Sequence, residues 1–213
     1  MPSLLVHLGV GALIAAALLS RHYDWKALAV VLAVVALPDL DTIIGIWVTG
    51  AHRTVLHNIW IVVIPAALLA WDVGIREEST VRTRFGDRGV RIGWVSLVAL
   101  AVGHILLDAF YNGVNLFWPL HDTFYDLSGS LIYSTDRGFV QTFVDVSNPE
   151  AMARGTTEDV HYRTGVDPAG PGESPDDLER IFYLVNSGEL LVLTIAGYLI
   201  AGYRLLEVHR PEA

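Results

Sequence analysis

The sequence of 213 residues contains no cysteine, and Lys26 is its only lysine. The absence of cysteine excludes disulfides and thiolate ligands, so any bound metal must be held by imidazole and carboxylate groups. The formal net charge is −9. Phosphate backbones are bound by clustered basic side chains, which this sequence does not provide, so we expect no nucleic-acid partner.

Hydrophobic residues make up 53% of the chain, more than in an average soluble domain. They gather in five apolar stretches, at residues 4–19, 27–37, 54–71, 92–111 and 181–206. Five such stretches leave too little polar sequence to cover a large soluble core, which is the alternative interpretation. The sequence therefore predicts an all-α, polytopic membrane bundle of about five transmembrane helices, forming a single domain over residues 1–213.

The charges of the connecting segments predict how this bundle is oriented. Residues 76–91 contain five arginines, which favours the cytoplasmic side for this loop. The segment 112–180 contains twelve acidic residues and four arginines, so we expect it to form an external loop region between the fourth and fifth helices. The N-terminus is then outside and the C-terminus cytoplasmic. A secretory signal over the first stretch is the alternative, but its basic n-region is missing.

The external segment is the part of the sequence that does not resemble a membrane helix. Residues 133–146 mix β-branched and aromatic side chains with polar ones, which predicts a short pair of strands. Residues 167–177 are rich in proline and glycine, which predicts a loop.

Histidine and aspartate side chains are expected to gather at the outer ends of the first four helices. His104 and Asp108 are four residues apart, so an α-helix would place imidazole and carboxylate on one face. Ionisable groups in apolar segments are costly, and the usual reason for keeping several together is a functional polar site. The set comprises His7, Asp39, Asp41, His52, Arg53, His57, His104 and Asp108.

Each of these residues also has a simpler interpretation. His7 alone would be an interfacial or hydrogen-bonded histidine. Asp39 or Asp41 could cap a following helix, and Arg53 could anchor the chain at lipid headgroups. Glu189 is expected about eight residues into the last helix, and an intramembrane carboxylate is a candidate ligand.

His121 follows an aromatic turn in the external segment, and a structural role is favoured for it.

The order of the motifs resembles a known family. His7 is followed by PDLD at 38–41, HRTVLH at 52–57, HILLD at 104–108 and NLFWP at 115–119. This pattern is similar to the membrane-bound metal-dependent hydrolase family that includes LexA-binding inner-membrane proteins, and more distantly to zinc-dependent phospholipase C. The resemblance covers residues 1 to about 120. It departs from the family pattern at Thr54, Leu56 and Asn58, where Gly, Thr and Ser are common.

The resemblance implies a cluster of two or more divalent ions with His57, His104 and Asp108 as core ligands. Zinc is the first expectation, with manganese or another first-row ion as the alternative. Further ligands are expected among His7, Asp41, His52 and Glu189.

The expected activity is metal-dependent hydrolysis of a phosphoester in a membrane phospholipid or lipid-linked phosphate. Asp39 would be the non-ligating proton acceptor, and Arg53 would bind the phosphate with two hydrogen bonds. Two alternatives remain open at this point. One is a non-catalytic membrane interaction protein stabilised by metal, and the other is a divalent-metal transporter.

Overall fold

The computed structural model describes residues 2–48, 50–162, 164–165 and 179–209. By their internal contacts, the residues form two compact units. The helical unit comprises residues 2–37, 59–107 and 184–213, and the loop unit comprises residues 1, 38–58 and 108–183. Each unit is described by itself.

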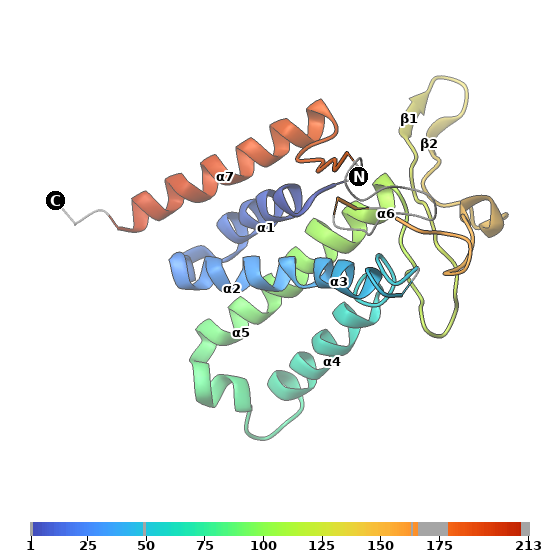
Figure 1. The fold of residues 1–213 in the computed structure, drawn as a ribbon. Helices are drawn as coiled ribbons and strands as arrows, with labels where there is room; N and C mark the ends of the chain where they lie inside the picture. Colours follow the sequence, from blue (N-terminus) through green and yellow to red (C-terminus); the bar gives the residue numbers. More distant parts are fainter. Residues whose placement is uncertain (1, 49, 163, 166–178, 210–213) are drawn as a thin grey trace. The chain divides into compact units, whose positions relative to one another are not determined.

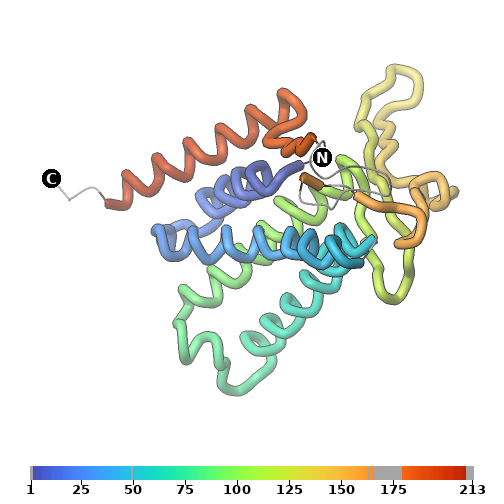
Figure 2. The backbone as a smooth tube through the Cα atoms, in the orientation of Figure 1, coloured from blue at the N-terminus to red at the C-terminus, as the bar shows by residue number. Residues whose placement is uncertain are grey.

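Most of the helical unit consists of five α-helices, which Figures 1 and 2 show as elongated segments: α1 (Leu4–Leu18), α2 (Trp25–Ala36), α4 (Trp60–Gly74), α5 (Thr80–Leu100) and α7 (Gly188–Val208). A short 3₁₀ turn, η1 (Ser20–His22), follows α1, and the π-helical segment η3 (Ala101–Leu106) continues α5. Helix α1 lies against α2, α5 and α7, whereas α4 lies against α5. The core is built largely from alanine and valine, such as Ala12, Ala15 and Val31.

Side-chain caps explain where several of these helices begin. The Asp24 carboxylate accepts a hydrogen bond from the backbone N–H of Ala27 at the start of α2. Ser187 caps α7 in the same way. These bonds satisfy backbone donors that have no partner inside the first turn.

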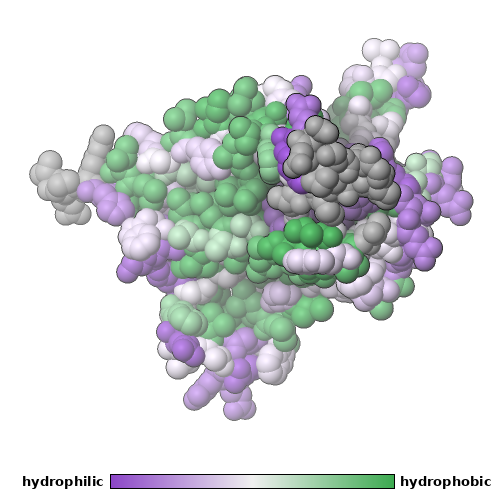
Figure 3. Space-filling view, viewed as in Figure 1, coloured by the Kyte–Doolittle hydropathy of each residue, from purple (hydrophilic) through white to green (hydrophobic). Residues whose placement is uncertain are grey.

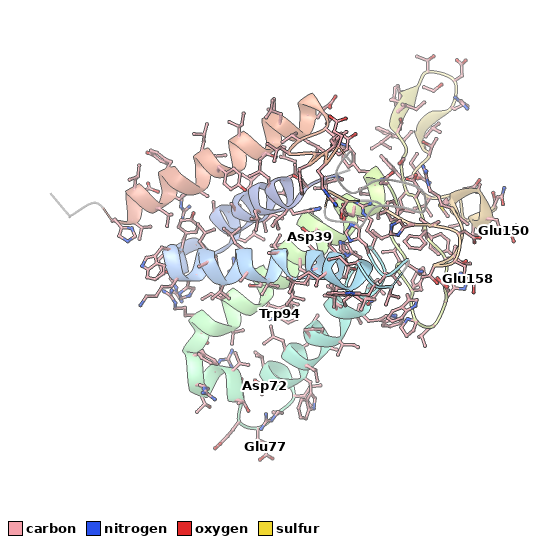
Figure 4. All side chains as sticks on the ribbon, viewed as in Figure 1. Asp39, Asp72, Glu77, Trp94, Glu150 and Glu158 are labelled. Atoms are coloured by element: carbon pink, nitrogen blue, oxygen red, sulfur yellow. The ribbon has the colours of Figure 1, made fainter. Side chains whose placement is uncertain are left out.

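The turn between α4 and α5 is organised around Asp72, which Figure 4 labels near the end of α4. Its carboxylate accepts hydrogen bonds from the Ser79 hydroxyl at 2.6 Å and from the backbone N–H groups of Thr80 and Val81, both at 3.0 Å. Helix α5 is then broken at Gly86, whose φ of 66° lies in the left-handed region.

The prediction of membrane helices is confirmed, but the prediction of five spans is not. Among the described residues, two helical stretches are long and apolar enough to cross a membrane, at Thr80–Tyr111 and Gly188–Val208. A third is added if α2 and the following residues Pro38–Gly45, bent by 45°, count as one span. Helices α1 and α4 have 15 residues each, or about 22 Å at 1.5 Å per residue, against a hydrocarbon core of about 30 Å. The orientation of the termini stays a prediction.

Large apolar side chains remain exposed on the helices of this unit, including Val30 on α2, Ile64 and Leu68 on α4, and Leu199 on α7. Figure 3 shows apolar residues over much of the helical unit on the face it presents. Soluble proteins seldom expose such large contiguous apolar surfaces, so these faces are suited to lipid.

The loop unit contains only short elements. These are η2 (Pro38–Leu40), α3 (Asp41–Gly45), the residues of α6 (Leu107–Tyr111) from Asp108 onward, β1 (Leu131–Ser134), β2 (Gly138–Gln141) and η4 (Pro149–Met152). Strands β1 and β2 form an antiparallel hairpin, visible in Figure 1, with Tyr133 opposite Phe139. The strand pair predicted for residues 133–146 is confirmed, although β1 begins two residues earlier, at Leu131, and the pair ends at Gln141. The loop predicted at 167–177 lies outside the described residues.

Close packing of α1 and α7 depends on glycine. A Cβ atom added at Gly197 would lie 2.0 Å from the backbone oxygen of Gly9, which is far inside van der Waals contact. Small residues allow helix backbones to approach in this way, and such contacts contribute to association of helices in a membrane.

We predict that Gly197→Ala destabilises the protein, because the methyl group forces α7 away from α1. The expected loss is about 1 to 3 kcal/mol, measured from thermal or denaturant unfolding in detergent. Gly202→Ala is the matched control on the same helix, since a Cβ there meets no atom within 4 Å. Alanine favours helices over glycine, so this control should be neutral or slightly stabilising. Equal effects of the two substitutions would contradict the close contact.

Candidate metal centre

The loop unit contains a buried carboxylate placed between two histidines. Asp41 begins α3 and is 0% exposed. Its Oδ1 accepts a hydrogen bond from His52 Nδ1 at 2.8 Å, and its Oδ2 accepts one from His57 Nδ1, also at 2.8 Å. A carboxylate only accepts hydrogen bonds, so both imidazoles donate from Nδ1. Metal-binding histidines are oriented in this way, with Nε2 left as the ligand atom.

The Nε2 atom of His57 faces two further carboxylates. Asp108 Oδ2 lies 3.3 Å from it, and Asp39 Oδ1 lies 3.9 Å from it. Two ligands bound to tetrahedral zinc at about 2.0 to 2.2 Å lie roughly 3.3 to 3.6 Å apart. The His57–Asp108 distance fits a pair that shares one ion. The longer distance, from His57 Nε2 to Asp39 Oδ1, agrees better with an Asp39 carboxylate that lies near the ion but does not bind it.

Arg53 is buried beside this pair, with 1% of its surface exposed. Its guanidinium donates from NH2 to Asp108 Oδ1 at 2.6 Å and from NH1 to the Gly113 carbonyl at 3.1 Å. It also lies over the ring of Tyr162, 4.9 Å from the ring centroid. Arg53 therefore holds one oxygen of Asp108 while the other oxygen faces His57. Phosphate binding by Arg53 stays a prediction.

The electrostatics of this site favour positive charge. His57 lies in the turns before α4, outside the helices. Burial lowers the pKa of His57, but hydrogen bonds and negative charge from Asp108 and Asp41 outweigh burial and raise the pKa to about 9. The carboxylates that stabilise a proton on this imidazole would also stabilise a divalent cation bound in its place.

The donor set in the loop unit fits a divalent metal ion. Asp41, His52 and His57 are all buried, and their ligand atoms lie within 4.8 Å of one another. The short distances join Asp41 to Nδ1 of each imidazole, so Asp41 orients the two histidines and Nε2 would be the atom of each that binds an ion. Within the described part of the chain, His52 Nε2 is buried and has no hydrogen-bond partner. Buried polar atoms are normally satisfied, so this nitrogen is suited to a ligand. Imidazole and carboxylate donors together are compatible with zinc, manganese and other first-row ions.

The helical unit contains a second pair of buried histidines. The rings of His7 and His104 are stacked, with centroids 3.8 Å apart. Each Nδ1 donates to a backbone carbonyl, that of Gly103 at 2.9 Å from His7 and that of Val35 at 2.7 Å from His104. All four predicted ligand histidines thus use Nδ1 for an outer hydrogen bond. A single centre that includes both units stays a prediction.

The structure corrects the setting of two of these residues. His104 lies in the π-helical segment η3 rather than in an α-helix, so the spacing of four residues to Asp108 does not have its usual α-helical meaning. Glu189 is exposed in the first turn of α7, because the helix begins at Gly188 and not near 181. The expected depth of Glu189 is therefore wrong. A carboxylate in this first turn stabilises the helix dipole.

His121 lies outside the cluster and contacts Tyr125, with 2.9 Å between His121 Nε2 and the tyrosine hydroxyl. This contact agrees with the structural role expected for it.

Two supporting residues received no role from the sequence. Asn115 is buried, its backbone N–H donates to the Arg53 carbonyl at 3.0 Å, and its side chain donates to Asp122 at 2.6 Å. Arg53 itself has a positive φ of 63°, a strained conformation for a side chain of this size. Asn115 is the first residue of the NLFWP motif, and this motif is the sequence signal that could have identified it. Tyr162, which lies against the Arg53 guanidinium, had no sequence signal.

The fold and the site define a helical membrane protein with a buried histidine and aspartate cluster. Residues 1–163 match the YdjM inner membrane protein family, and the chain belongs to that family. Comparisons with curated proteins and with solved structures found no match. The family supports the membrane part of the expected resemblance, whereas the hydrolase and phospholipase parts stay predictions.

We predict that Asp41→Ala destabilises the metal-free protein, because it removes the acceptor of two buried imidazole N–H groups. Each buried donor left unsatisfied costs about 1 to 3 kcal/mol, so we expect the unfolding free energy to fall by roughly 3 kcal/mol in chelator. Asp136→Ala, in the exposed hairpin turn, is the control. Similar unfolding midpoints for the two variants would contradict the proposed importance of Asp41.

Proposed function

We propose that this protein is a membrane-bound, metal-dependent hydrolase that cleaves a phosphoester in a lipid or lipid-linked substrate. The observation that carries the proposal is the Asp41 carboxylate, which accepts a hydrogen bond from Nδ1 of His52 and of His57, so that Nε2 is the atom of each that would bind a metal ion. This arrangement of carboxylate, histidine and metal is common in metalloenzymes.

His57 Nε2 and Asp108 Oδ2 would hold the ion. His52 is proposed as a further ligand from the same unit, because its Nε2 is buried and has no hydrogen-bond partner among the described residues. His7 and His104 are proposed to supply ligands from the helical unit. This part of the proposal rests on the ordered motifs that carry the family resemblance. A bound first-row cation would act as a Lewis acid on the phosphoryl oxygen and lower the pKa of a bound water.

Asp39 is suited to accept a proton from the attacking water. Its side chain is 24% exposed, whereas that of Asp41 is fully buried. Its Oδ1 lies 3.9 Å from His57 Nε2, near enough to act on a water at the centre. A positioned carboxylate of this kind contributes about 10²- to 10⁴-fold to the rate of a reaction.

The substrate class follows from the surroundings of the site and from the resemblance. The helices expose apolar faces that suit a bilayer, so the substrate is expected to arrive from lipid. The similarity to metal-dependent hydrolases and, more distantly, to phospholipase C favours a phosphoester. The acidic segment 112–180 favours the external face for the site, and the arginine-rich residues 76–91 favour the cytoplasmic side for their own end of the helices; this orientation stays a prediction.

Burial of the ligands favours a second function. His57 is 0% exposed and Asp108 is 1% exposed, which suits a structural ion with a closed coordination shell. The protein would then be a metal-stabilised membrane protein without catalytic activity.

We predict that the purified protein, loaded with zinc or manganese, releases phosphate or headgroup from phospholipids or lipid-linked phosphates. Asp39→Asn should lower kcat by about 10²- to 10⁴-fold with metal content unchanged, because the proton acceptor is lost. Asp136→Asn is the matched control and should retain full activity. Metal binding without turnover on any phosphoester would instead support the metal-stabilised alternative.

Arg53→Lys separates two roles of the arginine in the same assay. If Arg53 acts by holding Asp108, the lysine variant should bind metal about 10- to 100-fold more weakly and regain activity in excess metal. If Arg53 binds phosphate, the activity should remain low at full metal loading. Wild-type behaviour in both measurements would exclude both roles.

A further inference from the structure

The helical unit contains a groove whose lining, within the described residues, includes none of the histidines and aspartates of the metal centre. Its volume is about 800 Å³, and it is formed by α2, α4 and α5. Its walls are apolar, with Val34 from α2, Ile61 and Leu69 from α4, and Leu97 from α5 among the lining residues. Sites for small molecules typically have volumes of about 300 to 1,000 Å³ and mostly apolar walls.

Glycines on α5 keep this groove open. Gly89 and Gly93 both line it and are one helical turn apart. A Cβ atom at Gly93 would lie 3.0 Å from Leu69 Cδ2 on α4. A larger side chain at Gly93 would occupy the space between α4 and α5.

Among the described residues, one charged side chain lines the groove, and it is basic. Arg88 lines it, donates to Asp24 at 2.6 Å and keeps a side chain that is 40% exposed. Residues 80–91 contain four arginines and a single acidic residue, Asp87. Basic pockets between membrane helices bind anionic lipid headgroups, and each cation near the surface contributes about 1 kcal/mol.

A buried hydroxyl also lines the groove. Ser96 is 4% exposed and lines the groove, and within the described part of the chain its Oγ has no hydrogen-bond partner. Ser96 is two helical turns beyond Arg88, about 12 Å at 1.5 Å per residue. A buried donor without a partner is costly, so this hydroxyl indicates an occupant that carries an acceptor oxygen.

We propose that the groove binds one anionic phospholipid, whose phosphate contacts Arg88 and whose acyl chain lies between α2, α4 and α5. Charge complementarity selects the headgroup, because Arg88 is the one charged residue among the described lining residues and its side chain is 40% exposed. The apolar walls take the chain, and an ester oxygen of the lipid supplies an acceptor for Ser96. The site is independent of the proposed hydrolase activity.

The test is native mass spectrometry of the full-length protein in detergent, titrated with phosphatidylglycerol or with phosphatidylcholine of the same acyl chains. The wild-type protein should bind one phosphatidylglycerol roughly fivefold more tightly than phosphatidylcholine. Arg88→Gln should abolish this preference, whereas Arg84→Gln, in the same basic segment but outside the groove lining, should retain it.

Ser96→Leu tests the chain-binding part of the groove. The added side chain occupies the space and removes the hydroxyl, so binding of both lipids should weaken at least fivefold. Gly93→Ala adds only a methyl group and keeps the test valid if Ser96→Leu fails to fold. It should weaken the binding of both lipids to a smaller degree. Equal affinity of the wild-type protein for the two lipids would overturn the proposal. So would a dimer that dissociates in Ser96→Leu while lipid binding is unchanged.

Discussion

The site depends on one buried interaction, the contact of Asp41 with two imidazoles. A fully buried carboxylate is stable only when its charge is compensated. Here the compensation comes from His52 and His57, which donate to separate oxygens. This contact fixes which nitrogen of each ring faces outward. The chemistry proposed for the site follows from that orientation, because a histidine can bind metal only through a nitrogen that is not committed elsewhere.

A second interaction supports the first. Arg53 holds Asp108 from one side and is held in turn by the Gly113 carbonyl and the Tyr162 ring. Breaking a buried ion pair leaves an uncompensated charge, so pairs of this kind are retained where they position other groups. Asp108 is thereby presented to His57 Nε2 at a distance that suits a shared ion. The loop unit thus needs segments that are far apart in sequence to assemble one centre.

Several features could be predicted from sequence because they depend on local pattern. Apolar runs located α1, α2, α4, α7 and the second half of α5, and β-branched and aromatic residues mixed with polar ones located the β1–β2 hairpin. The sequence predicts an arginine-rich loop over the first half of α5, from Thr80, because the charged residues there conceal the helix. The site aspartates and histidines stood out because ionisable groups are rare in apolar sequence. Other features depend on tertiary packing or on capping. The start of α7 at Gly188 follows from the Ser187 cap, and the π-helical turn at His104 has no pattern of apolar residues to mark it. Long-range partners such as Tyr162 could not be found from spacing.

The central claim is that His57 and Asp108 hold a divalent metal ion. It is tested most directly by the metal content of the purified full-length protein, measured by inductively coupled plasma mass spectrometry. We expect about one or more equivalents of a first-row divalent metal in the wild-type protein, and a content reduced roughly 10- to 100-fold in His57→Ala. His121→Ala should match the wild type. A wild-type protein without metal, or an unchanged content in folded His57→Ala, would contradict the account.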